Sequence, residues 1–156
     1  MSNDTPATDD QDGRHNVVFL LREAYLRLND VVITRLAEQG HDAVRPAHAA
    51  VFQFLDDAGT TVSMLAQRAR MTKQAMAQLV LHLEEHGYVA RSPDPADRRA
   101  KLVVPTDRGR EVFTVARGLV PEIEGLVGDI IGTDRLASMR ADLEAIRRAV
   151  TPGEAT

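Results

Sequence analysis

The stretch that decides the fold is residues 62–101, which read VSMLAQRARMTKQAMAQLVLHLEEHGYVARSPDPADRRAK. It predicts two short helices joined by a tight turn, followed by a two-stranded hairpin with a basic tip. That arrangement is a helix-turn-helix with a wing, which is a motif that binds duplex DNA. We interpret the rest of the chain as a dimerisation region that pairs two such motifs and sets the distance between them.

The first helix of this stretch is predicted from Val62 to Arg70. Thr61 is suited to be its N-cap, because the threonine hydroxyl can accept a free amide of the first turn. The residues that form an apolar stripe at helical spacing are Val62, Leu65, Ala66 and Ala69.

The second helix is predicted to follow Thr72, its N-cap, and to end near His86. Gly87 then stands where a left-handed residue commonly ends a helix. The buried face should comprise Met76, Leu79, Val80 and Leu83. The candidate DNA contacts of this recognition helix are Thr72, Lys73, Gln74, Ala77, Gln78 and His82.

The outer face of this helix has side chains that suit DNA. Gln74 and Gln78 are four positions apart and project together, and glutamine can make bidentate contacts with adenine, while Lys73 can pair with phosphate or guanine. Residues 62–82 also hold three basic side chains and no acidic one, which gives a local field that attracts a polyanion. An ordinary solvated face is the simpler alternative.

The hairpin is predicted from two short strands, Tyr88–Ser92 and Lys101–Pro105. The sequence PDPADRR between them is rich in turn-forming proline and aspartate. An arginine at such a tip can enter the minor groove, where the potential is most negative. We expect Asp97 to pair with Arg99 and hold its guanidinium in one pose. The candidate wing residues are Asp97, Arg98, Arg99 and Lys101.

Residues 65–111, LAQRARMTKQAMAQLVLHLEEHGYVARSPDPADRRAKLVVPTDRGRE, resemble the MarR family of bacterial transcriptional regulators. The family's wing pattern Asp-x-Arg-x-Lys falls on Asp97, Arg99 and Lys101, and its next helix starts similarly at Thr106 and Gly109. The resemblance implies a winged-helix homodimer that binds a pseudo-palindromic operator, usually as a repressor, and is often released by a small molecule.

Three residues depart from the family's pattern. Met64 stands where relatives often carry glutamate, so no capping box forms with Thr61. Leu81 places an apolar side chain on the outer side of the recognition helix, and Pro105 should terminate the second wing strand.

Length and composition limit the function classes. A chain of 156 residues with 44% hydrophobic residues fits one domain, or one domain with a dimerisation layer. The absence of cysteine excludes disulfides, thiolate metal sites and cysteine nucleophiles. No run of 18 apolar residues occurs and the N-terminus is polar and acidic, so we expect a cytoplasmic protein without a membrane contact.

The net charge of −4 conceals a segregation of charge along the chain. Residues 1–13 contain four aspartates and no lysine or arginine, which accounts for the whole excess. Residues 62–101 hold seven basic side chains against four acidic ones, so the predicted DNA-binding stretch is basic.

The fold class is therefore mainly α with a small β-hairpin wing, that is, a winged helix-turn-helix with long N- and C-terminal dimerisation helices. The predicted parts are a disordered acidic tail (1–13), an N-terminal dimerisation helix (14–40), the DNA-binding lobe (44–106) and C-terminal dimerisation helices (107–150). The first long helix should run from His15 to Gln39. A shorter one should start at Pro46 and end near Asp57, with Val51, Phe54 and Leu55 in the core.

The C-terminal helices each carry an apolar seam. Thr106 should cap a helix over 107–131, with a bend at 117–121 because Pro121 removes a backbone hydrogen bond. Thr133 should cap the last helix, from Asp134 to Val150, whose seam is Leu136, Met139, Leu143, Ile146 and Val150. A two-fold dimer built on these helices would place two recognition helices about 34 Å apart.

Two metal readings stay open as alternatives. His82-Leu83-Glu84-Glu85-His86 spells the zinc-peptidase motif H-x-x-E-H, but a catalytic zinc also needs a third ligand and an open cleft. A zinc-responsive DNA-binding regulator could instead use histidines near the first two helices, namely His15, His41 and His48. We favour neither and expect no enzymatic activity, no catalytic residue, no bound metal and no cofactor.

The function we expect is sequence-specific binding of double-stranded DNA by a homodimeric repressor, released by a small aromatic or phenolic ligand. In the resembled family the ligand pocket lies between the DNA-binding lobe and the dimer helices. Candidate liners, which combine apolar surface with polar tips, are Tyr25, His48, Phe52 and Phe113. Core packing is an equally good reading of these four residues.

Overall fold

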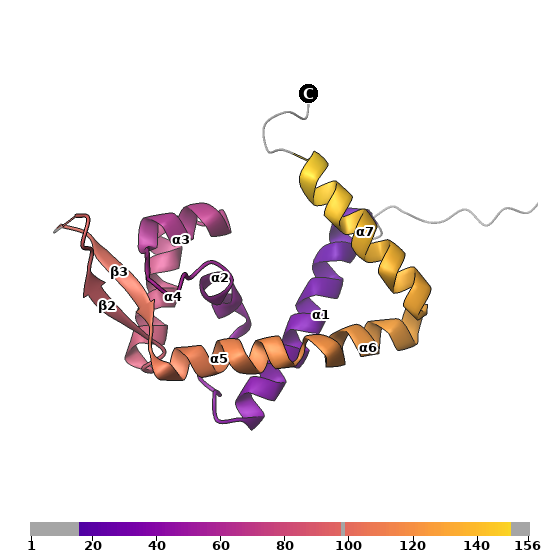
Figure 1. Ribbon diagram of the computed structural model, residues 1–156, viewed down its shortest axis with the longest axis horizontal. Coiled ribbons are helices and arrows are strands. Elements are labelled where there is room, and N and C mark those ends of the chain that lie inside the picture. Colours follow the sequence, from indigo (N-terminus) through magenta and orange to yellow (C-terminus); the bar gives the residue numbers. More distant parts are fainter. Residues whose placement is uncertain (1–15, 98, 151–156) are drawn as a thin grey trace, which may run out of the picture. The chain divides into compact units, whose positions relative to one another are not determined.

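The computed structural model describes residues 16–97 and 99–150. The chain divides into two compact units, Met1–Gly109 and Arg110–Thr156, and each is described by itself (Figure 1). The predicted acidic tail, His15 and Arg98 lie outside the described residues.

The first unit begins with helix α1, Val17–Glu38. Asn16 caps it, because its side chain accepts a hydrogen bond from the amide of Phe19 at 2.9 Å. The chain leaves the helix at Gly40, which has a φ of +88°. Leu36 is its buried residue, whereas the apolar side chains of its first half are exposed: Val17, Val18, Leu20, Leu21 and Tyr25. The predicted helix is confirmed, and its apolar side chains pass from exposed in the first half to half-buried at Leu28 and Val32 and buried at Leu36.

The second predicted helix is shorter than expected. A 3₁₀ turn, η1 (Pro46–His48), leads into α2 (Ala49–Phe52), so the helix ends well before Asp57. The following residues form a turn instead, in which the amide of Gly59 donates to the carbonyl of Asp56. That turn directs the chain into strand β1 (Thr60–Thr61). Val51 and Leu55 are buried as predicted, and Phe54 is half-buried.

Helices α3 (Val62–Ala69) and α4 (Lys73–Glu85) form the predicted helix-turn-helix. The hydroxyl of Thr61 caps α3 by accepting the amide of Met64 at 3.2 Å. The turn between the helices includes Arg70 in the left-handed region, with a φ of 53°. Val62, Leu65 and Ala66 of α3 are buried, and they join a core of aliphatic side chains from α2, α4 and the sheet.

The wing belongs to a three-stranded antiparallel sheet, not to the isolated hairpin that was predicted. Strands β2 (Val89–Pro93) and β3 (Lys101–Pro105) pair from Val89 opposite Pro105 to Pro93 opposite Lys101. Strand β1 adds to the other edge of β3, with Thr60 opposite Val103. Figure 1 shows the β2–β3 hairpin projecting away from α3 and α4. The extra strand ties the base of the wing to the start of α3.

The start of helix α5 (Asp107–Gly118) is fixed against the wing. Thr106 caps it as predicted, accepting the amide of Gly109 at 3.1 Å. Gly109 itself lies so close to the carbonyl of Tyr88 that any Cβ at this position would collide with it. The guanidinium of Arg108 donates to the carbonyl of Gly40 at 2.9 Å and lies 4.8 Å from the ring centre of Tyr88.

The second unit contains the rest of α5, then α6 (Val120–Ile131) and α7 (Thr133–Ala149). The predicted helix over 107–131 is interrupted at Leu119, next to Pro121 and within the range 117–121 where a bend was predicted. The prediction that Thr133 caps the last helix is wrong. Gly132, with a φ of 90°, occupies the cap position, and its carbonyl accepts the amide of Leu136 at 3.0 Å. Within the described residues, none of the helices has the length and apolar character needed to cross a bilayer.

Candidate nucleic-acid interface

The recognition helix α4 is held in one rotation by its core face. Met76, Val80 and Leu83 are each 0% exposed, so this side of the helix cannot turn outward without opening the core. Thr72 fixes its start, because its hydroxyl accepts the amide of Ala75 at 3.1 Å. The opposite side must therefore face solvent.

That opposite side carries the predicted base-reading residues. Gln74 and Gln78 are exposed and, at 100° per residue, lie within one sector of the helix; Ala77 beside them is half-buried. Leu81 lies in the same sector and is 43% exposed. Lys73 is exposed at the first turn, where the helix dipole adds to its positive charge. The structure thus gathers five predicted contacts, Thr72 included, on one accessible surface.

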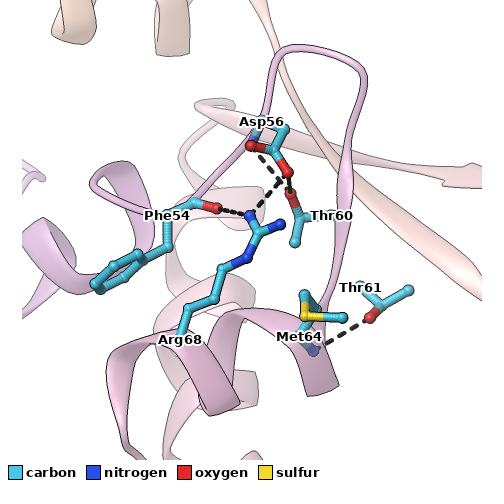
Figure 2. Close-up of polar contacts among 6 residues, drawn as sticks. All are labelled: Phe54, Asp56, Thr60, Thr61, Met64 and Arg68. Atoms are coloured by element: carbon cyan, nitrogen blue, oxygen red, sulfur yellow. Dashed lines mark hydrogen bonds and ion pairs between the residues drawn. The ribbon is translucent and has the colours of Figure 1, made fainter. Parts of the chain in front are cut away.

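One of the three basic residues counted in residues 62–82 serves the scaffold. Figure 2 shows that the guanidinium of Arg68 donates to the carbonyl of Phe54 at 2.9 Å and to the carboxylate of Asp56 at 2.8 Å. Thr60 donates to the same carboxylate at 3.1 Å. The hydrogen bonds from Arg68 and then Thr60 hold the pKa of Asp56 below its usual value. Arg68 therefore braces the loop before α3, and Arg70 and Lys73 carry the exposed charge nearby.

The wing presents exposed cations at its tip. Arg99 and Lys101 are both exposed. Asp97 accepts the backbone amide of Arg99 at 2.9 Å, and the amide of Ala100 donates to the carbonyl of Asp97 at 2.9 Å. Among residues 16–97 and 99–150, no ion pair joins the side chains of Asp97 and Arg99. Asp97 therefore shapes the turn, in place of the predicted pairing with the guanidinium.

The wing is also fixed relative to α4. The amide of Tyr88 donates to the carbonyl of Leu83 at 2.8 Å, which leads the chain directly from the helix into β2. The hydroxyl of Thr106, after β3, donates to the carbonyl of Gly87 at 2.6 Å. An ion pair at 3.3 Å joins Glu84 and Arg91. These contacts join the base of the wing to the recognition helix, an arrangement in which the two can meet adjacent grooves of a duplex.

His82 has a different position from the one predicted. Its Nε2 donates to the carbonyl of Ala43 at 2.9 Å, and its ring stacks on His48 with centroids 4.7 Å apart. The ring of His86 also lies close to that of His82, at 4.2 Å between centroids, and its Nδ1 donates to the carbonyl of His82 at 2.8 Å. The ring of His82 therefore contacts His48 of η1 and Ala43 of the loop before η1. Position 82 lies at the edge of the exposed face of α4, which allows these contacts.

The buried member of this histidine stack is neutral. His48 is 2% exposed, and its Nδ1 accepts the amide of Arg45 at 2.9 Å. Desolvation lowers the pKa of His48 to about 4, with smaller contributions from the charges of His82, Arg45 and His86. Sequence reasoning missed this stack, although the spacing of His82 and His86 showed that those two share a helix face.

The metal alternatives gain no support from the geometry. Across residues 16–97 and 99–150, no group of three or more histidine, aspartate or glutamate side chains is arranged to hold a metal ion. His82 and His86 of the H-x-x-E-H motif direct ring nitrogens to backbone carbonyls. His41 is buried beside Tyr88, at 5.7 Å between ring centres, and His15 lies outside the described residues.

The predicted ligand-binding residues divide between the units. Tyr25, His48 and Phe52 belong to the first unit and Phe113 to the second, so their grouping stays a prediction. Tyr25 is 47% exposed, His48 is buried, and the two phenylalanines are half-buried. A shallow apolar pocket of about 280 Å³ lies elsewhere, lined by Thr133, Leu136, Ala137 and Arg140.

A helix-turn-helix with an exposed outer face, followed by a wing with a basic tip, defines a winged-helix DNA-binding domain. Residues 44–100 match the model of the MarR family. A structure of CouR from Rhodococcus jostii RHA1 bound to p-coumaroyl-CoA aligns with a TM-score of 0.66 and 26% identity, over 90% of this chain and 98% of that one. Over its winged-helix region, residues 44–100, this chain matches the MarR family of transcriptional regulators, and the CouR alignment extends the likeness to most of its length.

Two curated relatives extend the comparison. The transcriptional regulator HosA from Escherichia coli is 26% identical over 79% of this chain and 87% of its own length. The transcriptional activatory protein BadR from Rhodopseudomonas palustris is 35% identical over 47% of this chain, and the match spans only 41% of BadR. The transcriptional repressor CouR has also been solved bound to a 23-mer DNA duplex. That structure aligns with a TM-score of 0.67 at 23% identity. Members of this family are transcription factors and not enzymes.

Proposed function

We propose that this protein is a homodimer that binds a pseudo-palindromic DNA operator through α4 and the wing and represses transcription from it. The observation that carries the proposal is the rotation of α4. Burial of Met76, Val80 and Leu83 turns Gln74 and Gln78 outward on the helix that begins with Lys73, and Arg99 is exposed at the tip of the wing. Glutamine reads base edges in the major groove, and the cations bind phosphate and the minor groove.

Homodimerisation is supported by apolar surface that the single chain leaves exposed. Five apolar residues of the first half of α1 are open to solvent. In α6 and α7 the exposed apolar side chains are Val120, Leu126, Ile130, Met139, Leu143 and Ile146. Exposed apolar side chains in such number on a helix favour an interaction site, and a two-fold dimer would present two α4 helices to successive major grooves.

Release by a small molecule is the next part of the proposal. The family relative CouR has been solved with p-coumaroyl-CoA, a thioester of an aromatic acid. We propose an aromatic or phenolic ligand here, with Tyr25, His48, Phe52 and Phe113 as candidate contacts. Such a ligand would act by favouring a dimer whose recognition helices no longer match successive grooves.

The test is a gel-shift titration of the full chain against the DNA upstream of its own coding sequence, at several salt concentrations. We expect one shifted species whose affinity falls steeply with salt, and release on addition of an aromatic acid or its thioester. Equal affinity for unrelated duplexes at all salt concentrations would refute sequence-specific binding. Parallel titrations with zinc and with a chelator test the metal-responsive alternative, and we expect no change in either.

A further inference from the structure

We infer that the outer face of α4 recognises thymine through its C5-methyl group, with Leu81 as the principal contact. This inference rests on the proposed function, since it requires α4 to lie in a major groove. The observation behind it is the exposure of Leu81. Met76, Val80 and Leu83 of the same helix are completely buried, whereas Leu81 is 43% exposed on the opposite side.

The position of Leu81 places it among the base-reading residues. It follows Gln78 by three positions and Gln74 by seven, which are the separations that bring helix residues onto one face. At a rise of about 1.5 Å per residue, Leu81 lies roughly 10 Å along the helix from Gln74, or about three base-pair steps of 3.4 Å. A helix that contacts adenine through Gln74 would therefore bring Leu81 to a base pair about three steps away.

The chemistry of this face matches A·T pairs. The carboxamides of Gln74 and Gln78 can bond the N6 and N7 atoms of adenine. Thymine, opposite adenine, is the base that offers an apolar group in the major groove, and an aliphatic side chain is the group that binds it. Ala77, half-buried between the glutamines, adds a second methyl surface. The fully described helix α4 contains no arginine, the residue that most often reads guanine.

The position of Leu81 favours a contact with DNA over a contact with a protein partner. The exposed apolar residues proposed for dimerisation lie on α1, α6 and α7, apart from α4 in the chain. On its own helix, Leu81 is flanked by Ala77 and Gln78 toward the N-terminal end and by Glu84 and Glu85 toward the C-terminal end, and the exposed cations Arg70 and Lys73 lie at the helix start. Leu81 is therefore the exposed apolar group next to a base-reading glutamine, where a thymine methyl can meet it.

The experiment begins with selection of binding sites from random duplex DNA by the full-length protein. Each thymine of the selected half-site is then replaced by deoxyuridine, which removes only the methyl group. At one position the affinity should fall about fourfold for the wild type, the effect of losing one buried methyl contact. With Leu81→Ala the same replacement should have almost no effect. Met64→Ala, which alters an equally exposed apolar residue on α3, should retain the uracil penalty.

The possible outcomes separate this inference from the proposed function. If selection enriches no sequence, sequence-specific binding fails and the inference fails with it. If a half-site is enriched but uracil is tolerated throughout, or if Leu81→Ala keeps the full penalty, DNA recognition stands and methyl readout by Leu81 is overturned. Circular dichroism and sedimentation confirm that both variants keep the fold and association state. A changed association state in Leu81→Ala would assign the residue to a protein interface and also overturn the inference.

Discussion

The helix-turn-helix with its wing and the last two helices of the chain bury their apolar residues in different ways. In the first region, α4 and the sheet supply side chains that are fully buried, such as Met76, Leu83 and Val103. Of the described residues 133–149 of α7, none is buried, and in α6 the buried residue is Gly128. The DNA-binding region therefore buries its apolar side chains within a single chain, whereas the C-terminal helices leave apolar side chains exposed, which a second copy would cover in the proposed dimer.

The largest effect is expected from a cavity in the DNA-binding region. Leu83→Ala removes a completely buried side chain, and it should lower the free energy of unfolding by about 3 kcal/mol. Urea denaturation followed by circular dichroism measures the change. Leu81→Ala, two positions away and exposed, is the matched control and should stay within about 0.5 kcal/mol of the wild type. Similar losses in the two variants would contradict the assignment of inner and outer faces.

The second effect concerns the surface that α7 leaves open. Leu143→Asp places a charge in the apolar seam and should dissociate the dimer, with roughly a 100-fold loss of operator affinity because the second half-site is no longer bound by the same molecule. Sedimentation velocity and a gel-shift titration measure both quantities. Ser138→Asp, on the opposite side of the helix, should leave the dimer intact. A Leu143→Asp protein that remains dimeric would remove α7 from the proposed interface.

A third effect should appear as a pH dependence of the DNA-binding region. His48 has a pKa of about 4 when folded and about 6.5 when unfolded, so the unfolded chain binds more protons between these values. Stability should therefore be full above pH 6.5 and fall by about 2 kcal/mol between pH 7.5 and pH 5. His48→Asn, which keeps an acceptor for the amide of Arg45 but does not titrate here, should flatten this slope in urea denaturation. An unchanged slope would assign the titration to other groups.

The smallest effect should come from the wing. Arg99→Ala removes an exposed cation, and we expect about a tenfold loss of operator affinity with no change in unfolding free energy. Arg135→Ala, an exposed arginine of α7, is the charge-matched control and should not alter binding. An Arg99→Ala protein that binds like the wild type would show that α4 acts without the tip of the wing.

Local signals in the sequence predicted the helices of this protein well. The hydroxyls of Thr61, Thr72 and Thr106 cap helices as expected, and the long helix is interrupted at Leu119, next to Pro121. These features depend on residues within one helical turn of each other, so the local sequence is enough to predict them.

Apart from the Thr133 cap and the length of the second helix, the misses involve contacts between residues far apart in the chain. Strand β1 has two residues and exists because Thr60 pairs with Val103, more than 40 positions away. His82 has a polar side chain on a helix edge, and only the folded chain brings the carbonyl of Ala43 to it. Arg68 is likewise drawn to Phe54 and Asp56. The base-reading and ligand-binding roles of individual residues stay predictions, since they depend on partners outside this chain.

The close approach of Gly109 to the carbonyl of Tyr88 has a consequence for how this family member can change over evolutionary time. Position 109 touches neither base nor phosphate in the proposed complex, yet every other amino acid would push the outgoing helix off the root of the wing. In a saturation mutagenesis screen scored by reporter repression, we expect position 109 to be as intolerant as the fully buried core. The residues that read DNA should be freer to diversify, because a new operator can compensate for them and nothing can compensate for a displaced helix.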